Sequence, residues 1–274
     1  MKILILGGRG FVGHNLKNYL SNFYHVETAS RNRDETNQYF DINDSESYSV
    51  CENNYDVIIN CIVNYENSVH DTIKNELNTK LEFINFINKT KVHYIEISSI
   101  SAINENKYLS VYNFNKFLLE EMILFVANKQ PSFEFSIIRF AQIIDEEEIA
   151  RKTQGAFYYF VDSFKNNTIL NVFGDPNKQR SYMPISYLVE VIKKCIDEKV
   201  LGVHNVVMPD RYSAQDLIKF FNKYVQKSED SILYDQTKFA FEYVIPPCSE
   251  YFINQLSSSN CETTFKKILL NEKV

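Results

Sequence analysis

Short apolar runs alternate with longer amphipathic segments through the first half of the chain. Each run has the length and β-branched composition of a buried strand, and each intervening segment repeats its apolar positions as one face of a helix does. The expected strands are residues 2–6, 25–29, 56–62, 92–98 and 134–140. The expected helices are residues 10–22, 44–53, 70–89 and 112–128. This alternation predicts β-α-β units that build one parallel sheet with helices on both faces.

The pattern becomes irregular after Arg139. An acidic cluster at residues 145–148 and an aromatic stretch at residues 157–160 follow, with no clear period in either. Regular elements are then expected as a helix at 186–199, a strand at 203–207, a helix that begins with a capping box at 213–216, a strand at 239–245, a loop at 257–260 and a short terminal helix. The second half therefore resembles a lobe added to the sheet.

Composition narrows the function classes. The 274 residues include 29 Lys and Arg against 35 Asp and Glu, a mildly acidic balance that argues against a nucleic-acid partner. The apolar runs are shorter than the roughly 18 residues that cross a bilayer, and residues 3–6 are too short for a signal-peptide core. Five scattered cysteines and five histidines without ligand spacing predict neither a disulfide framework nor a metal site. We expect a cytoplasmic protein that binds no membrane.

A glycine-rich turn follows the first expected strand. Residues 7–13 read GGRGFVG, with Gly7, Gly10 and Gly13 in a G-x-x-G-x-x-G pattern. Glycine suits a strand that turns sharply into a helix while its backbone approaches a pyrophosphate, and the helix N-terminus offers free N–H groups. The residues expected to contact a dinucleotide here are Gly7, Arg9, Gly10, Phe11, Val12 and Gly13. An ordinary tight turn is the alternative.

The end of the second strand indicates which dinucleotide binds. A carboxylate at this junction would hold the ribose 2′-hydroxyl of NAD(H), but Ser30 and Arg31 stand there instead. Together with Arg33 they offer one hydroxyl and two guanidinium groups to a 2′-phosphate, and Arg9 in the glycine turn offers a third guanidinium. NADP(H) is therefore favoured and NAD(H) remains possible, since Arg31 and Arg33 are also consistent with solvated loop charges.

A candidate catalytic set follows the strand at 92–98. Ser99 lies at its end, and Tyr112 and Lys116 begin the next helix four residues apart, on one helical face. Free tyrosine titrates near pH ~10, and an adjacent ammonium group favours the phenolate, which suits acid–base work near neutral pH. A serine hydroxyl can hold the reacting oxygen. The set predicts hydride-transfer chemistry on an alcohol or ketone, with a surface Tyr/Lys pair as the alternative.

These motifs together resemble the extended short-chain dehydrogenase/reductases, the nucleotide-sugar epimerase/dehydratase/reductase family, over residues 1 to about 220. The resemblance implies that Asp41 and Ile42 contact the adenine, that Cys61 ends the strand beside the nicotinamide, and that Lys116 also holds the nicotinamide ribose. It implies catalytic roles for Ser99, Tyr112 and Lys116. The residues it implies for binding a nucleotide sugar are Ser99, Gln142 and Arg180. Family members commonly form homodimers, so a homodimer is possible here.

The resemblance implies an α/β fold: a Rossmann-type doubly wound parallel sheet with a smaller C-terminal substrate-binding lobe. We expect an NAD(P)-binding Rossmann domain at residues 1–165 and a substrate-binding lobe at residues 166–274, with residues 186–207 returning to the sheet. Ile100 and Ser101 replace the Asp-Glu pair of the family's dehydratases, which disfavours dehydration.

Three functions remain open. The first is an NADPH-dependent reductase of a nucleotide-linked keto sugar, with Tyr112 as the proton donor. The second is a nucleotide-sugar 4-epimerase with tightly bound NAD. The third is a dinucleotide-sensing protein without chemistry, for which the spacing of Tyr112 and Lys116 has no use.

Overall fold

The structure is a computed structural model that describes residues 1–32, 34, 37–63, 77–152, 154–238, 243–256 and 261–271. The chain divides into two compact units. Unit 1 comprises Met1–Phe140 and Val189–Asn205, and unit 2 comprises Ala141–Leu188 and Val206–Val274. The domain boundary expected at residue 165 stays a prediction.

Unit 1 is built on a seven-stranded sheet with the order β10-β6-β5-β4-β1-β2-β3. The strands are β1 (Lys2–Leu6), β2 (His25–Ser30), β3 (Gln38–Tyr39), β4 (Val57–Asn60), β5 (His93–Ser99), β6 (Phe135–Phe140) and β10 (Gly202–Val206). Pairing is parallel from β6 through to β3. From β1 the strands β2 and β3 extend toward one edge of the sheet, and the strands from β4 onward extend toward the other. The switch point of this doubly wound sheet therefore lies between β1 and β4. The predicted Rossmann-type α/β class is confirmed.

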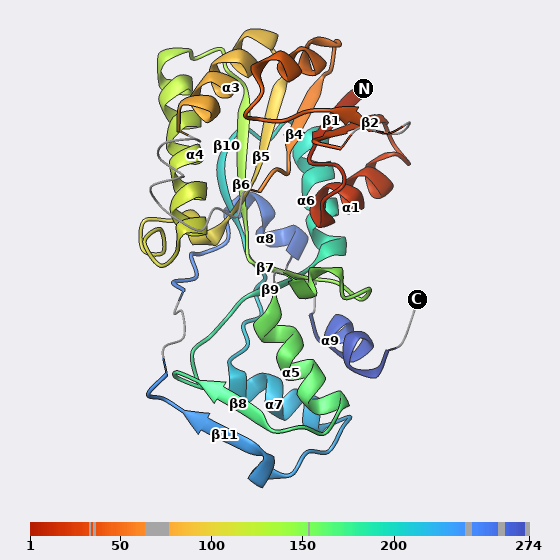
Figure 1. Cartoon of the computed structure of the whole chain (residues 1–274), viewed down its shortest axis with the longest axis vertical. Coiled ribbons are helices and arrows are strands. Elements are labelled where there is room, and N and C mark those ends of the chain that lie inside the picture. The colour runs from red at the N-terminus through yellow and green to blue at the C-terminus, as the bar shows by residue number, and fades with distance from the viewer. Residues whose placement is uncertain are drawn as a thin grey trace. The chain divides into compact units, whose positions relative to one another are not determined.

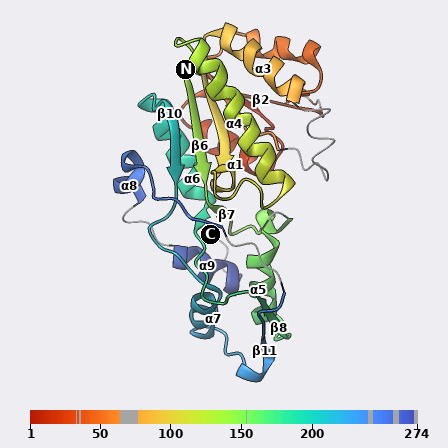
Figure 2. The ribbon, with the colours of Figure 1, turned by 90° about the vertical axis from the view of Figure 1, so that its left-hand side faces the viewer.

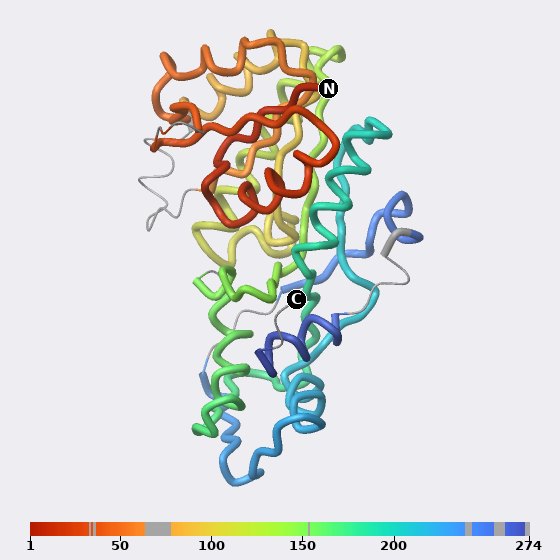
Figure 3. Tube along the Cα trace, turned by 90° about the vertical axis from the view of Figure 1, so that its right-hand side faces the viewer, coloured from red at the N-terminus to blue at the C-terminus, as the bar shows by residue number. Residues whose placement is uncertain are grey.

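Helices cover both faces of this sheet. Figures 1 and 2 show α3 (Leu77–Thr90) and α4 (Val111–Lys129) over one face, and Figure 3 shows α1 (Phe11–Leu20) and α6 (Ile185–Asp197) over the other. Because both faces are covered, successive residues of the central strands are buried, and Ile3–Leu6 of β1 are all 0% exposed. This burial explains the continuous apolar runs of the sequence.

Most predicted elements of unit 1 are confirmed within two residues. The helix expected at 44–53 is a 3-10 helix, Ser45–Glu52, whose N-cap Asp44 accepts a hydrogen bond from the Glu46 amide. The helix expected at 70–89 is described only from Leu77, because residues 64–76 lie outside the described residues. The short strand β3 was not predicted.

Among its described residues, unit 2 contains two small parallel ribbons and four α-helices that lie wholly within it. The ribbons pair β7 (Gln142–Ile144) with β9 (Tyr182–Pro184) and β8 (Leu170–Phe173) with β11 (Ile232–Asp235). The helices are α5 (Gly155–Lys165), α7 (Ala214–Asn222), α8 (Glu250–Leu256) and α9 (Cys261–Leu270). The capping box of α7 is confirmed between Ser213 and Asp216.

Two expectations for unit 2 require correction. The aromatic stretch at 157–160 belongs to α5. Phe157 and Phe164 of this helix are buried and both contact Phe221, and Phe157 also contacts Phe265. The strand expected at 239–245 is wrong for residues 243–245, which form no strand, while residues 239–242 lie outside the described residues. Neighbouring prolines at 246 and 247 lack the N–H groups that a sheet ladder uses.

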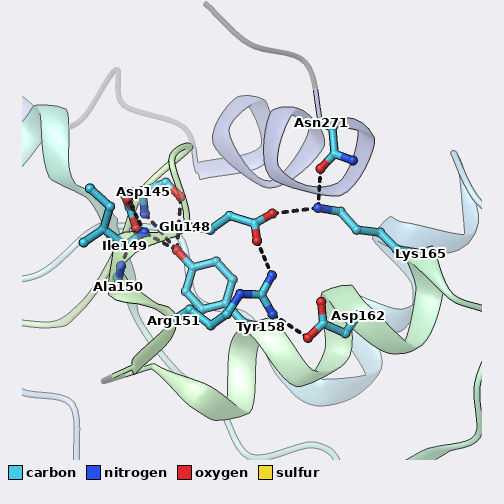
Figure 4. Close-up of polar contacts among 9 residues, drawn as sticks. All are labelled: Asp145, Glu148, Ile149, Ala150, Arg151, Tyr158, Asp162, Lys165 and Asn271. Carbon is cyan, nitrogen blue, oxygen red and sulfur yellow. Dashed lines mark hydrogen bonds and ion pairs between the residues drawn. The ribbon is translucent and has the colours of Figure 1, made fainter.

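Two members of the acidic cluster of unit 2, Asp145 and Glu148, have structural partners, which Figure 4 shows. The Asp145 carboxylate accepts hydrogen bonds from the Ile149 and Ala150 amides, both at 2.8 Å. Glu148 pairs with Arg151 and with Lys165. Within the described ranges, no group of three or more His, Cys, Asp or Glu side chains is arranged to hold a metal ion, and no helix there is long and apolar enough to cross a membrane.

Candidate active site

The glycine turn lies at the switch point of the sheet. Gly7 has a φ of +79°, and a Cβ at this position would lie 3.1 Å from the carbonyl carbon of Cys61, just beyond the end of β4. A Cβ on Gly13 would lie 2.4 Å from the Gly7 carbonyl oxygen. Both positions therefore require glycine for close backbone packing. The N-cap residue Gly10 makes no side-chain capping bond, so the first N–H groups of α1 fit a pyrophosphate.

Two of the residues expected at the ribose end, Ser30 and Arg9, already have protein partners. The Ser30 hydroxyl accepts a hydrogen bond from Asn37 at 2.7 Å and donates one to the Asn32 carbonyl at 3.2 Å. Arg9 forms an ion pair with Asp34, in which both side chains are largely exposed. Asp34 was missed in the sequence because it lies four residues beyond the end of β2, past the junction where a carboxylate was sought.

The residues implied for the adenine and for the strand beside the nicotinamide follow the same edge of the sheet. Asp41 follows β3 closely, its carboxylate accepts the Asn43 amide at 3.0 Å, and Ile42 is buried at 3% exposure. Cys61 is half-buried, and burial, followed by the nearby Glu96 carboxylate, raises the pKa of its thiol far above the usual range. A thiol in this state is not a nucleophile.

The expected catalytic residues come from β5 and α4. Ser99 is the last residue of β5, and its hydroxyl accepts the Ser101 amide at 3.1 Å. Tyr112 is the second residue of α4, which Ser110 caps by accepting the Asn113 amide at 3.1 Å. Lys116 follows one turn later and is 6% exposed. The cap fixes where the helix begins, and so places Tyr112 and Lys116 on one face near the end of β5.

Lys116 belongs to a buried polar network that was missed in the sequence. Its ammonium group donates to the Glu96 carboxylate at 3.0 Å and to the Ile97 carbonyl at 2.7 Å. Glu96 is 0% exposed, and its other oxygen accepts from Asn60 and from the Tyr94 hydroxyl, each at 2.8 Å. Glu96 and Asn60 stand inside apolar strand patterns, where the sequence alone indicates only core packing.

A pocket opens beside these residues. Tyr112 and Lys116 line it together with Lys80 and Asn115, which the sequence analysis did not single out. Asn115 is 4% exposed, and neither its side-chain nitrogen nor its oxygen has a hydrogen-bond partner among the residues that the structure describes. An amide left unpaired in a pocket is a site for the polar group of a ligand or for water.

Two of the residues expected to bind the substrate, Gln142 and Arg180, belong to unit 2. Gln142 begins β7, and its backbone amide donates to the Ser181 carbonyl at 3.2 Å, while its side-chain oxygen is buried with no hydrogen-bond partner in the described part of the chain. Arg180 is joined to Tyr212 through two backbone hydrogen bonds of 3.0 and 2.9 Å. Arg180 therefore lies in an isolated bridge with Tyr212, two residues before β9, the strand that pairs with β7.

Comparisons with known proteins agree with this fold. Residues 3–208 match the sequence model of the NAD dependent epimerase/dehydratase family. A protein of Methanocaldococcus jannaschii described as a putative UDP-glucose 4-epimerase is 25% identical over 221 residues, which cover 70% of this chain and 71% of that protein.

Two solved structures are similar to this chain at low identity. The UDP-glucose 4-epimerase of Thermotoga maritima with UDP-glucose has a TM-score of 0.77 and 17% identity over 98% of both chains. The dTDP-glucose 4,6-dehydratase of Bacillus anthracis in complex with NAD has a TM-score of 0.78 and 14% identity, over 98% of this chain and 96% of that chain. At these identities the likeness shows the fold alone.

Proposed function

Since this chain belongs to the NAD dependent epimerase/dehydratase family, we propose that it epimerises a nucleotide-linked sugar by hydride transfer. The observation that carries the proposal is the placement of Tyr112 and Lys116 on one face of α4, where both line the pocket that Ile62 and Val63 reach from the end of β4. A dinucleotide-sensing protein has no use for a buried lysine beside a tyrosine in this pocket.

The dinucleotide, when bound, supplies the hydride acceptor and donor. Tyr112 takes the proton of the sugar hydroxyl as the carbinol hydrogen leaves as hydride, and it returns a proton to the oxygen when hydride comes back to the opposite face of the carbon. Lys116 favours the phenolate of Tyr112 and holds the nicotinamide ribose. Ser99 orients the reacting oxygen by a hydrogen bond.

The choice between epimerase and reductase depends on the ribose end of the cofactor site. The sequence favoured an NADPH-dependent reductase, because Arg9 and Arg31 could receive a 2′-phosphate. The Arg9–Asp34 pair supports NAD instead, since its carboxylate repels a 2′-phosphate and can accept a ribose hydroxyl. The exposed Arg31 keeps the reductase as the second candidate.

The substrate class follows from family membership. The relatives described above include enzymes named for UDP-glucose and dTDP-glucose. We propose that Arg180 binds the diphosphate of such a substrate, because a guanidinium fork pairs two phosphate oxygens at once. Gln142 is proposed to contact the same substrate through its unpaired side-chain oxygen.

The test identifies both cofactor and product. Purified protein is denatured and the released nucleotide is identified, and native protein is given UDP-glucose or UDP-N-acetylglucosamine without added dinucleotide. We expect NAD in the supernatant and a 4-epimer that Tyr112→Phe does not form. An empty protein that oxidises NADPH with a nucleotide-linked keto sugar would establish the reductase, and inertness in both assays would leave the fold without this chemistry.

A further inference from the structure

The carboxylate of Glu96 has no part in the mechanism above, yet it lies at the centre of unit 1. Its neighbours along β5, Ile95 and Ile97, are apolar, as expected for a central parallel strand. A buried carboxylate is expensive at such a position unless charged and polar partners satisfy it. Here Lys116, Asn60 and the Tyr94 hydroxyl all donate to it.

The geometry restricts the Lys116 side chain. Its ammonium group has three N–H donors, and two of them point to Glu96 and to the Ile97 carbonyl. Within the described ranges, one donor is therefore left for a group bound in the pocket that Lys116 lines with Tyr112. Without Glu96, the long side chain would keep a single anchor on β5.

Glu96 also bears on the charge of Lys116. Burial by itself lowers the pKa of the Lys116 ammonium, but the Glu96 carboxylate, and after it Tyr112, raise it, and the resulting pKa lies above that of an ordinary lysine. A cation that favours the phenolate of Tyr112 must stay protonated through the working pH range. The neutral amine would offer no such help.

We propose that Glu96 is a positioning residue for Lys116: its buried carboxylate fixes the ammonium group beside Tyr112 and keeps it positively charged. This inference rests on the proposed roles of Tyr112 and Lys116. Glu96 itself touches neither substrate nor cofactor in this account, since it acts through Lys116.

The first test needs no turnover. Lysine side chains are labelled and their titration is followed by NMR, with the Lys116 signal assigned by its loss in Lys116→Met. In the unaltered protein we expect the Lys116 midpoint above that of free lysine in spite of burial. A midpoint below free lysine would overturn the proposal without any variant of Glu96, and so does not depend on whether such a variant folds.

The second comparison uses Glu96→Gln, which removes the charge at nearly constant shape. We expect the Lys116 midpoint to fall by about one to three pH units. The matched control is Glu120→Gln, which removes another buried carboxylate, bonded to Arg139 at 2.9 Å rather than to Lys116, and should leave the midpoint near that of the unaltered protein. Equal midpoints in the unaltered protein and Glu96→Gln would refute the charge role.

Turnover separates a positioning role from a merely structural one. Relative to the unaltered protein, Glu96→Gln should lose more kcat at pH 10 than at pH 7, because the lowered Lys116 midpoint leaves a larger fraction of neutral amine at the higher pH. An even loss at both pH values indicates only structural damage and contradicts the proposal. If the unaltered protein lacks turnover while the NMR shift is observed, the proposed function fails and the Glu96–Lys116 coupling stands.

Discussion

Unit 1 contains two ion pairs that bear on the proposed site, and they differ in their exposure to water. In the Glu96–Lys116 pair, the side chains are 0% and 7% exposed. In the Arg9–Asp34 pair, they are 52% and 42% exposed. The first pair joins β5 to α4, and the second joins the glycine turn to the segment after β2.

This difference in exposure decides whether each cation can leave its carboxylate for a ligand. A buried pair loses much when one partner is removed, because the other charge remains out of water. An exposed pair is worth about 0–1 kcal/mol, since water solvates both charges. Lys116 is therefore a fixed group, while Arg9 can leave Asp34 for a phosphate.

The largest expected effect is the loss of folding stability when the carboxylate of the buried pair is removed, compared with removal of the carboxylate of the exposed pair. Glu96→Ala is expected to lower the free energy of unfolding by about 3–5 kcal/mol, because it leaves the Lys116 ammonium buried without a counter-charge. Asp34→Ala should change it by less than about 1 kcal/mol. Chemical denaturation of both variants checks the contrast, and similar losses would show that burial does not distinguish the two pairs.

The contrast between buried and exposed charges also applies to the pH dependence of folding stability at a buried histidine, His93. Burial, and secondarily the Lys199 charge, lowers the pKa of His93 from 6.5 to about 4, and its ring bonds Ser136 at 2.7 Å. Because the pKa of His93 is lower in the folded protein than in the unfolded chain, the neutral ring contributes folding stability above pH ~6.5. This contribution, about 3 kcal/mol, is lost as the pH falls toward ~4.

His93→Gln should flatten the fall in unfolding free energy across this pH range. His25→Gln is the control, because its ring is 69% exposed, and this variant should keep the pH dependence of the unaltered protein. A fall of the same size in all three proteins would assign the pH dependence to other groups.

The unpaired amide of Asn115 gives a smaller effect on binding. Asn115→Ala should weaken dinucleotide binding by about 1–3 kcal/mol if a group of the dinucleotide hydrogen-bonds to this amide. Asn113→Ala is the matched control on the same helix, since Asn113 already donates to the Asn106 carbonyl at 2.8 Å. Calorimetric titration compares the two, and unchanged affinity in Asn115→Ala would assign the amide to water.

The smallest effect concerns cofactor choice at the exposed pair. Asp34→Asn frees Arg9 and removes a charge that repels a 2′-phosphate. We expect the affinity for NADPH relative to NADH to rise about fivefold to tenfold, which is about 1 kcal/mol. An unchanged ratio would mean that Asp34 does not face the ribose.

The sequence predicted the sheet of unit 1 well because each central strand is apolar on both faces, as in Ile3–Leu6. It could not predict Glu96 and Asn60 as partners, since both stand alone in apolar runs and meet only when β4 and β5 pair. In unit 2, α5 was missed because its aromatic residues face a core assembled from distant segments, including Phe265. Asp34 was missed because only the folded loop brings it to Arg9.

In the proposed mechanism, Tyr112 carries the proton of a hydride-transfer reaction. Tyr112→Phe, which removes one hydroxyl and keeps the ring, tests this role when its kcat and dinucleotide affinity are measured. We expect kcat to fall about 10²-fold to 10⁴-fold while the dissociation constant changes by less than about twofold. Turnover equal to that of the unaltered protein would contradict this role.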